Sequence, residues 1–259
     1  MCELFAMSAK HPTKLELSLA TFAEHGGHTG PHKDGWGIAY YQGNDAWLVK
    51  APESAADSAT QTLVRASAPP SALVISHIRL ATQGAVGLSN TQPFSYPLAG
   101  KRIVFAHNGH VPKILESNEP NAYQPLGDTD SEQVFARLLS KLAQVESLPP
   151  VDKFAEVERF LISLADLGPL NLLFSDSDYL YAFSNKRTQK NGEVTAPGMH
   201  FLCRQCNAEN ERKLSGVDIN DDQQNLILFA SIPLSTERWQ PMKPNCLYVA
   251  QQGELIRRD

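Results

Sequence analysis

The sequence predicts an α+β fold in which largely antiparallel sheets are covered by helices. Strand-like segments open the chain, helices follow and strands return near the end, without the regular strand–helix alternation typical of parallel sheets. The 259 residues, 42% of them hydrophobic, can bury a large core. No linker or internal repeat is apparent, so residues 1–259 are expected to form a single domain.

The first half of the chain carries both strand and helix signals. In order, the expected elements are a strand at residues 2–8, a helix at 14–25, strands at 35–42 and 46–50, a helix at 54–66, and strands at 73–78 and 103–106. In the first helix Leu15, Leu19 and Phe22 recur at helical spacing, and Gly26-Gly27 ends it. The turn at residues 43–45 joins its flanking strands into a hairpin.

The clearest helix signal covers residues 131–145. Its apolar residues form one stripe: Val134, Phe135, Leu138, Leu139 and Leu142. Thr129 and Glu132 make a capping box at its start, and a second helix is expected at 153–167, beyond two prolines. Short strands are then expected at 171–175, 179–184, 200–203, 225–231 and 247–251, with loops at 185–195 and 207–224.

The composition argues against several classes of protein. The formal net charge of −5 is not typical of a nucleic-acid-binding protein. No apolar run approaches the ~18 residues of a membrane-spanning helix, and no signal peptide is recognisable. Four cysteines in a chain of this length do not resemble a disulfide framework. These features together favour a cytoplasmic location.

Cys2 directly follows Met1. Removal of Met1 would leave Cys2 with a thiol and a free α-amine on the same carbon. Because an α-amine titrates near ~7.7–8.0 and a thiol near ~8.5, the amine can accept the thiol proton near neutral pH. A nucleophile paired with an N-terminal amine is a known means of activation. The position also fits an ordinary buried cysteine in a first strand.

Three further segments carry groups suited to acyl chemistry. Arg79 ends a predicted strand and could bind a carboxylate, or form a structural ion pair. Asn108 and Gly109 offer a side-chain amide and a backbone N–H that could hold an oxyanion, although Asn-Gly is also a common turn. Asp130 could bind an ammonium group, although an acid also simply favours a helix N-terminus.

Together these segments resemble the class II glutamine amidotransferases, whose nucleophile is an N-terminal cysteine. Cys2 matches the family's catalytic cysteine. Residues 77–84, His-Ile-Arg-Leu-Ala-Thr-Gln-Gly, look like its His-Thr-Arg-Trp-Ala-Thr-His-Gly segment, and residues 90–93 resemble its Asn-Ala-Gln-Pro. Residues 107–109 match its His-Asn-Gly oxyanion motif, and residues 128–132 resemble its Thr-Asp-Thr-Glu helix start.

The resemblance implies an N-terminal-nucleophile (Ntn) hydrolase fold with four αββα layers. In it, Arg79 would hold the glutamine α-carboxylate and Asp130 the α-ammonium. The site residues that it implies are catalytic Cys2, Asn108 and Gly109, and substrate-binding Arg79, Asp130, Thr82, His107, Trp36 and Gly37. The family needs no metal or organic cofactor, so none is expected.

Departures from the family pattern point to a stand-alone branch without a synthase domain. Leu80 and Gln83 replace Trp and His, and residues 34–37, Asp-Gly-Trp-Gly, stand where the larger synthases have Asp-Ser-Ala-Gly. Residues 230–234 and Trp239 resemble a late segment of the stand-alone members. The function expected is a glutaminase-type amidohydrolase that releases ammonia from glutamine through a γ-glutamyl thioester.

Several alternatives stay open at this point. A partner protein could accept the ammonia, and the substrate could instead be a γ-glutamyl peptide or γ-glutamyl thiol conjugate. A chain that retained Met1 would be a catalytically silent regulatory or binding subunit. A homo-oligomer is also compatible with the sequence.

Metal binding is a weaker hypothesis. Cys203 and Cys206 form a Cys-x-x-Cys pair, but no second pair completes a zinc site. His25, His28 and His32 lack a matching carboxylate pattern and are expected in a loop flanking the active site.

Overall fold

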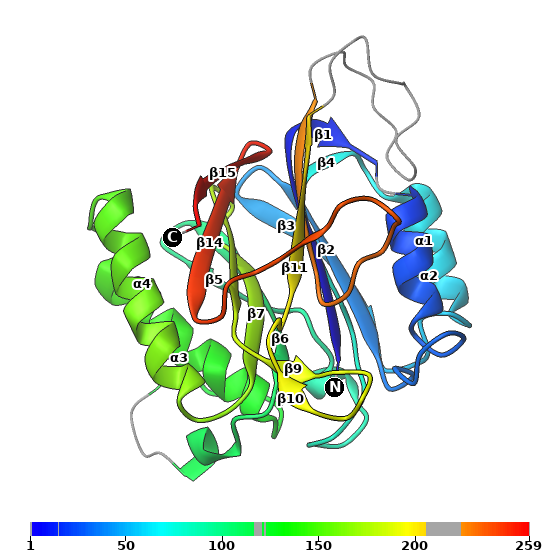
Figure 1. Ribbon diagram of the computed structural model, residues 1–259, viewed down its shortest axis with the longest axis horizontal. Coiled ribbons are helices and arrows are strands. Elements are labelled where there is room, and N and C mark those ends of the chain that lie inside the picture. The colour runs from blue at the N-terminus through cyan, green and yellow to red at the C-terminus, as the bar shows by residue number, and fades with distance from the viewer. Residues whose placement is uncertain (1, 15, 117–120, 122, 206–223, 259) are drawn as a thin grey trace.

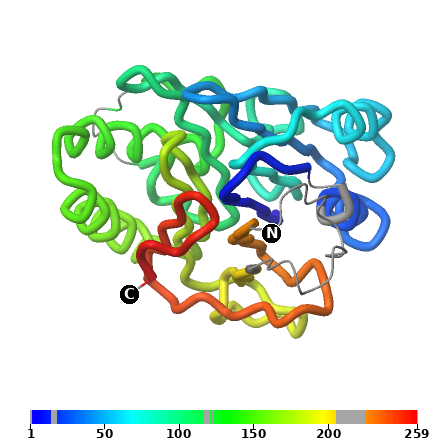
Figure 2. Tube along the Cα trace, turned by 90° about the horizontal axis from the view of Figure 1, so that it is seen from above, coloured from blue at the N-terminus to red at the C-terminus, as the bar shows by residue number. Residues whose placement is uncertain are grey.

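The computed structural model describes residues 2–14, 16–116, 121, 123–205 and 224–258. This part of the chain contains two large antiparallel sheets with helices on their outer faces, and a small two-stranded sheet (Figure 1). The seven-stranded sheet has the order β13-β11-β12-β1-β4-β2-β3, and the six-stranded sheet has the order β15-β14-β8-β7-β6-β5. Figure 2 shows α1 and α2 on one side of the molecule and α3 and α4 on the other. The α+β class and the four αββα layers are therefore confirmed.

The element bounds follow in chain order. The first half contains β1 (Glu3–Thr13), α1 (Glu16–Glu24), β2 (Trp36–Gln42), β3 (Asp45–Ala51), α2 (Ala59–Ser67), β4 (Ser71–Ile78), the 3-10 turn η1 (Leu88–Asn90), β5 (Phe94–Leu98), β6 (Lys101–Gly109) and the 3-10 turn η2 (Pro112–Glu116). The second half contains α3 (Asp130–Val145), α4 (Pro150–Ala165), β7 (Leu170–Ser175), β8 (Leu180–Ser184), β9 (Arg187–Thr188), β10 (Val194–Thr195), β11 (His200–Gln205), β12 (Asn225–Ala230), β13 (Gln240–Pro241), β14 (Cys246–Gln251) and β15 (Glu254–Arg257).

Three apolar layers hold the structure together. One lies between the two sheets and contains Leu4, Ala6, Ile75, Ala106 and Phe229. A second lies between the seven-stranded sheet and the helices α1 and α2, and a third lies between the six-stranded sheet and the helices α3 and α4. Alternating residues of each strand fill the layers on its two faces, so both sheets are buried on both sides near their centres.

Several sequence predictions of elements were wrong at their boundaries. The helix expected at 153–167 begins at Pro150, because a proline at the first helical position needs no hydrogen-bond partner for its nitrogen. The helix expected at 54–66 begins only at Ala59, since Ser58 accepts a hydrogen bond from Gln61 N as the N-cap. Strand β5 was missed because it contains Pro97, which an edge strand tolerates.

The segment expected as a loop at 185–195 contains the short β9–β10 hairpin. β13 and β15 were also missed, and both lie at sheet edges. Most of the loop expected at 207–224, and Cys206 with it, lies outside the described residues. Within the described part of the chain, no helix is both long enough and apolar enough to cross a membrane.

Candidate active site

Cys2 lies at the start of β1, the central strand of the seven-stranded sheet. β1 pairs with β12 on one side and with β4 on the other, and Glu3 faces Ile78 across the β4 ladder. The Cys2 thiol therefore lies beside the residues that follow β4, and its Sγ donates to the Leu80 carbonyl at 3.6 Å. Cys2 is half-buried, and burial raises the pKa of its thiol.

Strand alternation directs the Cys2 side chain between the two sheets. Cys2 has the same parity as Leu4 and Ala6, which pack in the layer between the sheets. Arg79 and Asp130 both act electrostatically on the Cys2 thiol, the first lowering its pKa and the second raising it. The structure therefore brings three of the predicted site residues to one end of the molecule.

Asn108 approaches the same place from the six-stranded sheet. It is fully buried near the end of β6, and its backbone carbonyl accepts from Asn171 Nδ2 at 2.9 Å. Its Nδ2 lies 3.4 Å from Ser231 Oγ, and Ser231 in turn accepts from Leu4 N at 3.0 Å. Within the described part of the chain, Asn108 Oδ1 is buried without a hydrogen-bond partner.

Gly109 allows a close approach between two backbone segments. A Cβ atom at this position would lie 2.1 Å from the Pro169 carbonyl oxygen, so no larger residue fits without moving the backbone. The next residue continues this contact, because His110 N donates to the same oxygen at 2.9 Å. Gly109 is thus the last residue of β6, where it pairs with Leu170 of β7 next to Asn108.

Arg79 organises the loop that follows β4. Its side chain is buried, with Nη1 donating to the Ala85 carbonyl at 3.0 Å and Nη2 donating to the carbonyls of Gln83 and Gly84 at 3.1 and 3.2 Å. Thr82 lies in the same loop and is exposed. The guanidinium therefore has a structural task besides the substrate contact predicted for it.

A carboxamide connects this loop to the start of α3. Asn90 Nδ2 donates to the Ala85 carbonyl and to Asp128 Oδ1, and Asn90 Oδ1 accepts from Asp128 N. Gly84 adopts a positive φ of 75° where a Cβ atom would lie 2.5 Å from Asp128 Oδ1. The loop after Arg79 and the segment before α3 are thereby fixed to each other.

Asp130 is the first residue of α3. Its Oδ2 accepts from Val111 N at 2.7 Å and its Oδ1 from Ser131 N at 2.9 Å. Thr129 caps the helix as predicted, with Oγ1 accepting from Glu132 N at 3.3 Å. Glu132 instead accepts from the backbone N–H groups of Leu126 and Gly127, so it orders the preceding loop.

Two buried histidines of the predicted motifs lie in different layers of the structure. His77 follows the parity of Ile75 and lies between the sheets, and burial, with a contribution from Arg79, lowers its pKa to about 3. His107 lies on the outer face of β6, where its Nδ1 is 2.9 Å from Ser131 Oγ, and burial lowers its pKa. His107 thus lies behind the site and supports the start of α3.

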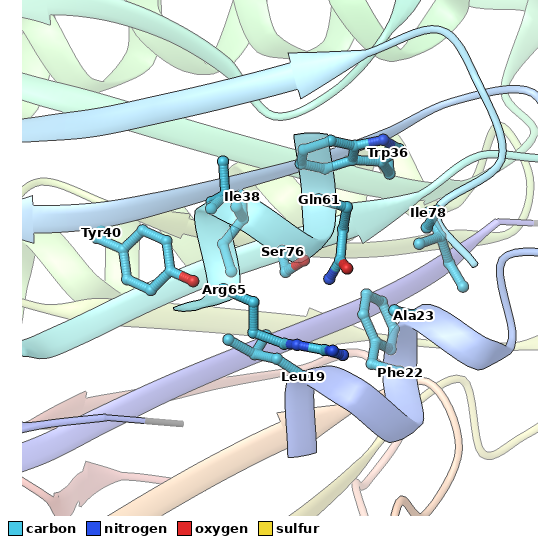
Figure 3. A pocket seen from close by; sticks show the side chains of 12 residues that line it. Leu19, Phe22, Ala23, Trp36, Ile38, Tyr40, Gln61, Arg65, Ser76 and Ile78 are labelled. Carbon is cyan, nitrogen blue, oxygen red and sulfur yellow. The ribbon is translucent and has the colours of Figure 1, made fainter. Parts of the chain in front are cut away.

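The Trp36 side chain lies on the face of the seven-stranded sheet opposite to that of Cys2, while its backbone pairs with Ile78, next to Arg79. Trp36 precedes Gly37 on β2, so the two residues face opposite sides of the sheet. The Trp36 ring lines a cavity of about 20 Å³ under α1 and α2, which Gln61 and Ser76 also line (Figure 3). Gly37 lies on the opposite face, where a Cβ atom would be 2.3 Å from the Gln92 carbonyl oxygen. The absence of a side chain at Gly37 thus lets the backbone of β2 pack closely against Gln92 and Pro93.

Three polar residues of the site were given no site role from the sequence, although Gln92 and Ser231 stand in segments that resemble the family. Gln92 pairs its carboxamide with the His107 backbone, accepting from His107 N at 2.6 Å and donating to its carbonyl. Asn171 supports the Asn108 backbone, and Ser231 contacts the Asn108 carboxamide. Asn171 occurs near the start of an apolar strand segment, where a single polar residue gives little signal, and the resemblance of residues 230–234 did not assign a role to Ser231.

Two of the three histidines expected to flank the site, His25 and His32, lie near Glu3. His25 Nδ1 is 2.8 Å from Glu3 Oε2, next to Cys2, and His32 Nδ1 is 3.2 Å from the His25 carbonyl. His28 contacts Glu24 and Asp57 instead. Among the described residues, no group of three or more His, Cys, Asp or Glu side chains could hold a metal ion.

Comparisons with known proteins identify relatives along the whole chain. A family model described as "Glutamine amidotransferases class-II" matches residues 1–258. The "Putative glutamine amidotransferase YafJ" of Escherichia coli is 41% identical over 187 residues, which cover 71% of this chain and 72% of the relative.

Solved structures share the fold. A predicted glutamine amidotransferase from Pseudomonas aeruginosa has a TM-score of 0.69 and 29% identity, with 98% of this chain and 99% of that chain covered. A glutamine phosphoribosylpyrophosphate amidotransferase from B. subtilis has a TM-score of 0.59 and 12% identity; the match covers 100% of this chain and 49% of that chain. The latter supports the fold alone.

The low pKa of His77 predicts a pH dependence of stability. The folded-state pKa of about 3 lies below the ordinary value of 6.5, so the unfolded chain binds the additional proton between these values. The free energy of unfolding should therefore fall as the pH drops from 6.5 toward 3, by at most about 1.4 kcal/mol per pH unit for this residue. His77→Gln should make the fall shallower in urea titrations at several pH values.

His28→Gln is the matched control. Glu24 and Asp57 raise the pKa of His28, so its contribution to stability is present at low pH and is lost as the pH rises. His28→Gln should therefore make the free energy of unfolding fall more steeply as the pH drops. If the free energy of unfolding depends on pH equally in the wild type and in His77→Gln, folding does not lower the pKa of His77.

Proposed function

Because the chain belongs to the class-II glutamine amidotransferases, we propose that it is a glutaminase-type amidohydrolase with Cys2 as the nucleophile. The observation that supports the proposal is that Asn108 of the six-stranded sheet contacts Ser231 Oγ, which accepts from Leu4 N, two residues after Cys2 at the start of β1. Removal of Met1 frees the Cys2 α-amine. Glutamine is the substrate that the family membership supports.

The raised pKa of the Cys2 thiol requires a base near neutral pH, and the α-amine of the same residue fills this role, through a water molecule. The thiolate attacks the γ-carbonyl carbon, and the negative charge on the oxygen is stabilised by Asn108 Nδ2 and Gly109 N–H. The C–N bond breaks, the protonated amine gives its proton to the leaving ammonia, and a γ-glutamyl thioester remains. Water then hydrolyses the thioester, which releases glutamate and restores the thiol.

Arg79 and Asp130 bind the amino-acid end of the substrate in this proposal. Both act electrostatically on the Cys2 thiol, so both lie within reach of its surroundings. The guanidinium pairs with the α-carboxylate, and the Asp130 carboxylate pairs with the α-ammonium. The ammonia passes to solvent or to an accepting partner protein.

The first test is intact mass and glutamate release on one purified sample. Loss of Met1 together with glutamate formation supports the proposal, and Cys2→Ala should then abolish turnover while glutamine binding persists. A sample without Met1 that releases no glutamate, with or without cell extract as a source of partner protein, contradicts it. Retained Met1 with no glutamate release favours the silent-subunit alternative, and cleavage to expose Cys2 followed by a second assay decides between them.

Arg79→Ala should raise KM for glutamine more than it lowers kcat. Loss of charge-assisted hydrogen bonds of about 1.5–3 kcal/mol corresponds to a rise in KM of about 10- to 150-fold. Arg102→Ala is the control, because Arg102 pairs with Asp45 near the other end of β6. Steady-state kinetics on both variants measure the effect, and an unchanged KM in Arg79→Ala would exclude Arg79 from substrate binding.

A cationic pocket favours a second candidate, hydrolysis of a γ-glutamyl compound with an acidic leaving group. The pocket has a volume of about 390 Å³ and is lined by Arg187, Thr188, Gln189, Lys190, Asn191 and Ile232. Arg187 Nη1 donates to the Ser231 carbonyl at 2.7 Å, so the pocket adjoins the Asn108 contact. A carboxylate on the leaving group would pair with its cations.

The two candidates are distinguished by a panel of glutamine, a neutral γ-glutamyl amide and a γ-glutamyl peptide with an acidic leaving group. The second candidate predicts that Arg187→Gln lowers kcat/KM about 10-fold or more for the acidic peptide alone. Arg159→Gln, on the exposed face of α4, is the control. A preference for glutamine that Arg187→Gln leaves unchanged would exclude the second candidate.

A further inference from the structure

The carboxamide of Asn108 has a donor and an acceptor that point in different directions from one carbon atom. One of them faces Ser231 Oγ at 3.4 Å, and the other lies buried without a partner among the described residues. The 3.4 Å separation exceeds the usual length of either an N–H···O or an O–H···O hydrogen bond. The contact therefore fixes the two residues as neighbours, and a half-turn of the carboxamide exchanges the atom that faces the hydroxyl.

Ser231 has one proton to donate, and its other contact does not use that proton. Its Oγ accepts from Leu4 N at 3.0 Å, while Ser231 N donates to the Leu4 carbonyl at 3.0 Å. The residue is buried, with 1% of its surface exposed. Since a buried hydroxyl proton without an acceptor is costly, the Asn108 carboxamide oxygen is the acceptor that the described contacts provide.

The two orientations of Asn108 have opposite chemical consequences. With Nδ2 on Ser231, the carboxamide oxygen occupies the unpartnered position and would repel a developing oxyanion there. With Oδ1 on Ser231, Nδ2 occupies that position and donates toward the substrate. The proton of Ser231 favours the second orientation, because only Oδ1 can accept it.

We propose that Ser231 is a positioning residue that holds Asn108 with Nδ2 toward the substrate. The inference rests on the proposed function, since it concerns the oxyanion donor of that reaction. Ser231 combines two tasks: its oxygen receives the Leu4 N–H of the central strand, and its proton selects the orientation of the Asn108 carboxamide. One hydroxyl group thus contacts both β1, which begins next to the nucleophile, and the oxyanion donor.

Ser231→Ala should lower kcat for glutamate release by about 10- to 50-fold with KM within a factor of three, a smaller loss than the ~10²–10³ of removing an oxyanion donor. Ser231→Thr keeps the hydroxyl and should restore kcat. Ser8→Ala is the matched control, because Ser8 is another buried serine of the layer between the sheets whose Oγ accepts a backbone N–H, from Gly253 at 3.2 Å. It should leave kcat unchanged.

A double-mutant cycle separates positioning from general structural damage. If Ser231 acts through Asn108, Ser231→Ala should cost kcat in the wild type but almost nothing when Asn108→Ala is already present. Additive losses in the double variant would overturn the inference, as would wild-type kcat in Ser231→Ala. The thermal unfolding midpoint of each variant shows that the compared proteins are folded.

Failure of the inference is distinguishable from failure of the proposed function. A wild-type protein with Cys2 exposed that releases no glutamate would refute the proposed function, on which the inference depends. An active wild type whose turnover is insensitive to Ser231→Ala would refute the inference alone.

Discussion

Hydrogen bonding of β1 to strands on both sides determines where Cys2 lies, because the residue before the central strand of a sheet has little freedom to move. The β4 ladder places the Arg79 loop on one side of Cys2, and the β12 ladder places Ser231 on the other. Strand parity then directs the thiol toward the second sheet. Position, neighbours and direction of this side chain thus follow from one set of backbone hydrogen bonds.

The second sheet contributes to the site through a layer that is apolar over most of its area and polar at one end. Asn108, Asn171 and Ser231 all lie at this end and have almost no exposed surface. Burying such groups costs free energy unless they are hydrogen-bonded, and their mutual contacts offset most of this cost. The unpartnered atom of the Asn108 carboxamide is the exception; in the orientation proposed above this atom is Nδ2, and the substrate oxygen is its partner.

Much of the fold could be predicted from the sequence because apolar periodicity determines which elements form. The apolar stripe of Val134, Phe135 and Leu138 predicted α3, and short apolar segments predicted β4, β6 and β7. The short edge strands could not be predicted, because pairing with a neighbour rather than local composition defines them. The number of strands in each sheet depends on such tertiary contacts.

The candidate site was predictable only in part, for a related reason. Arg79, Asn108 and Asp130 have residue types whose charge or donors indicate chemistry in a linear sequence, and the fold brings them toward Cys2. Trp36 stands beside Gly37 in the chain, yet strand alternation turns the Trp36 ring to one face of the sheet and the Gly37 Cα to the other. Ser231 is separated from Asn108 by 123 positions, so its role depends on a contact between sheets that no local pattern encodes. Nucleophile and substrate ligands therefore have a sequence signal, whereas the residues that orient them are determined by packing of one sheet on the other.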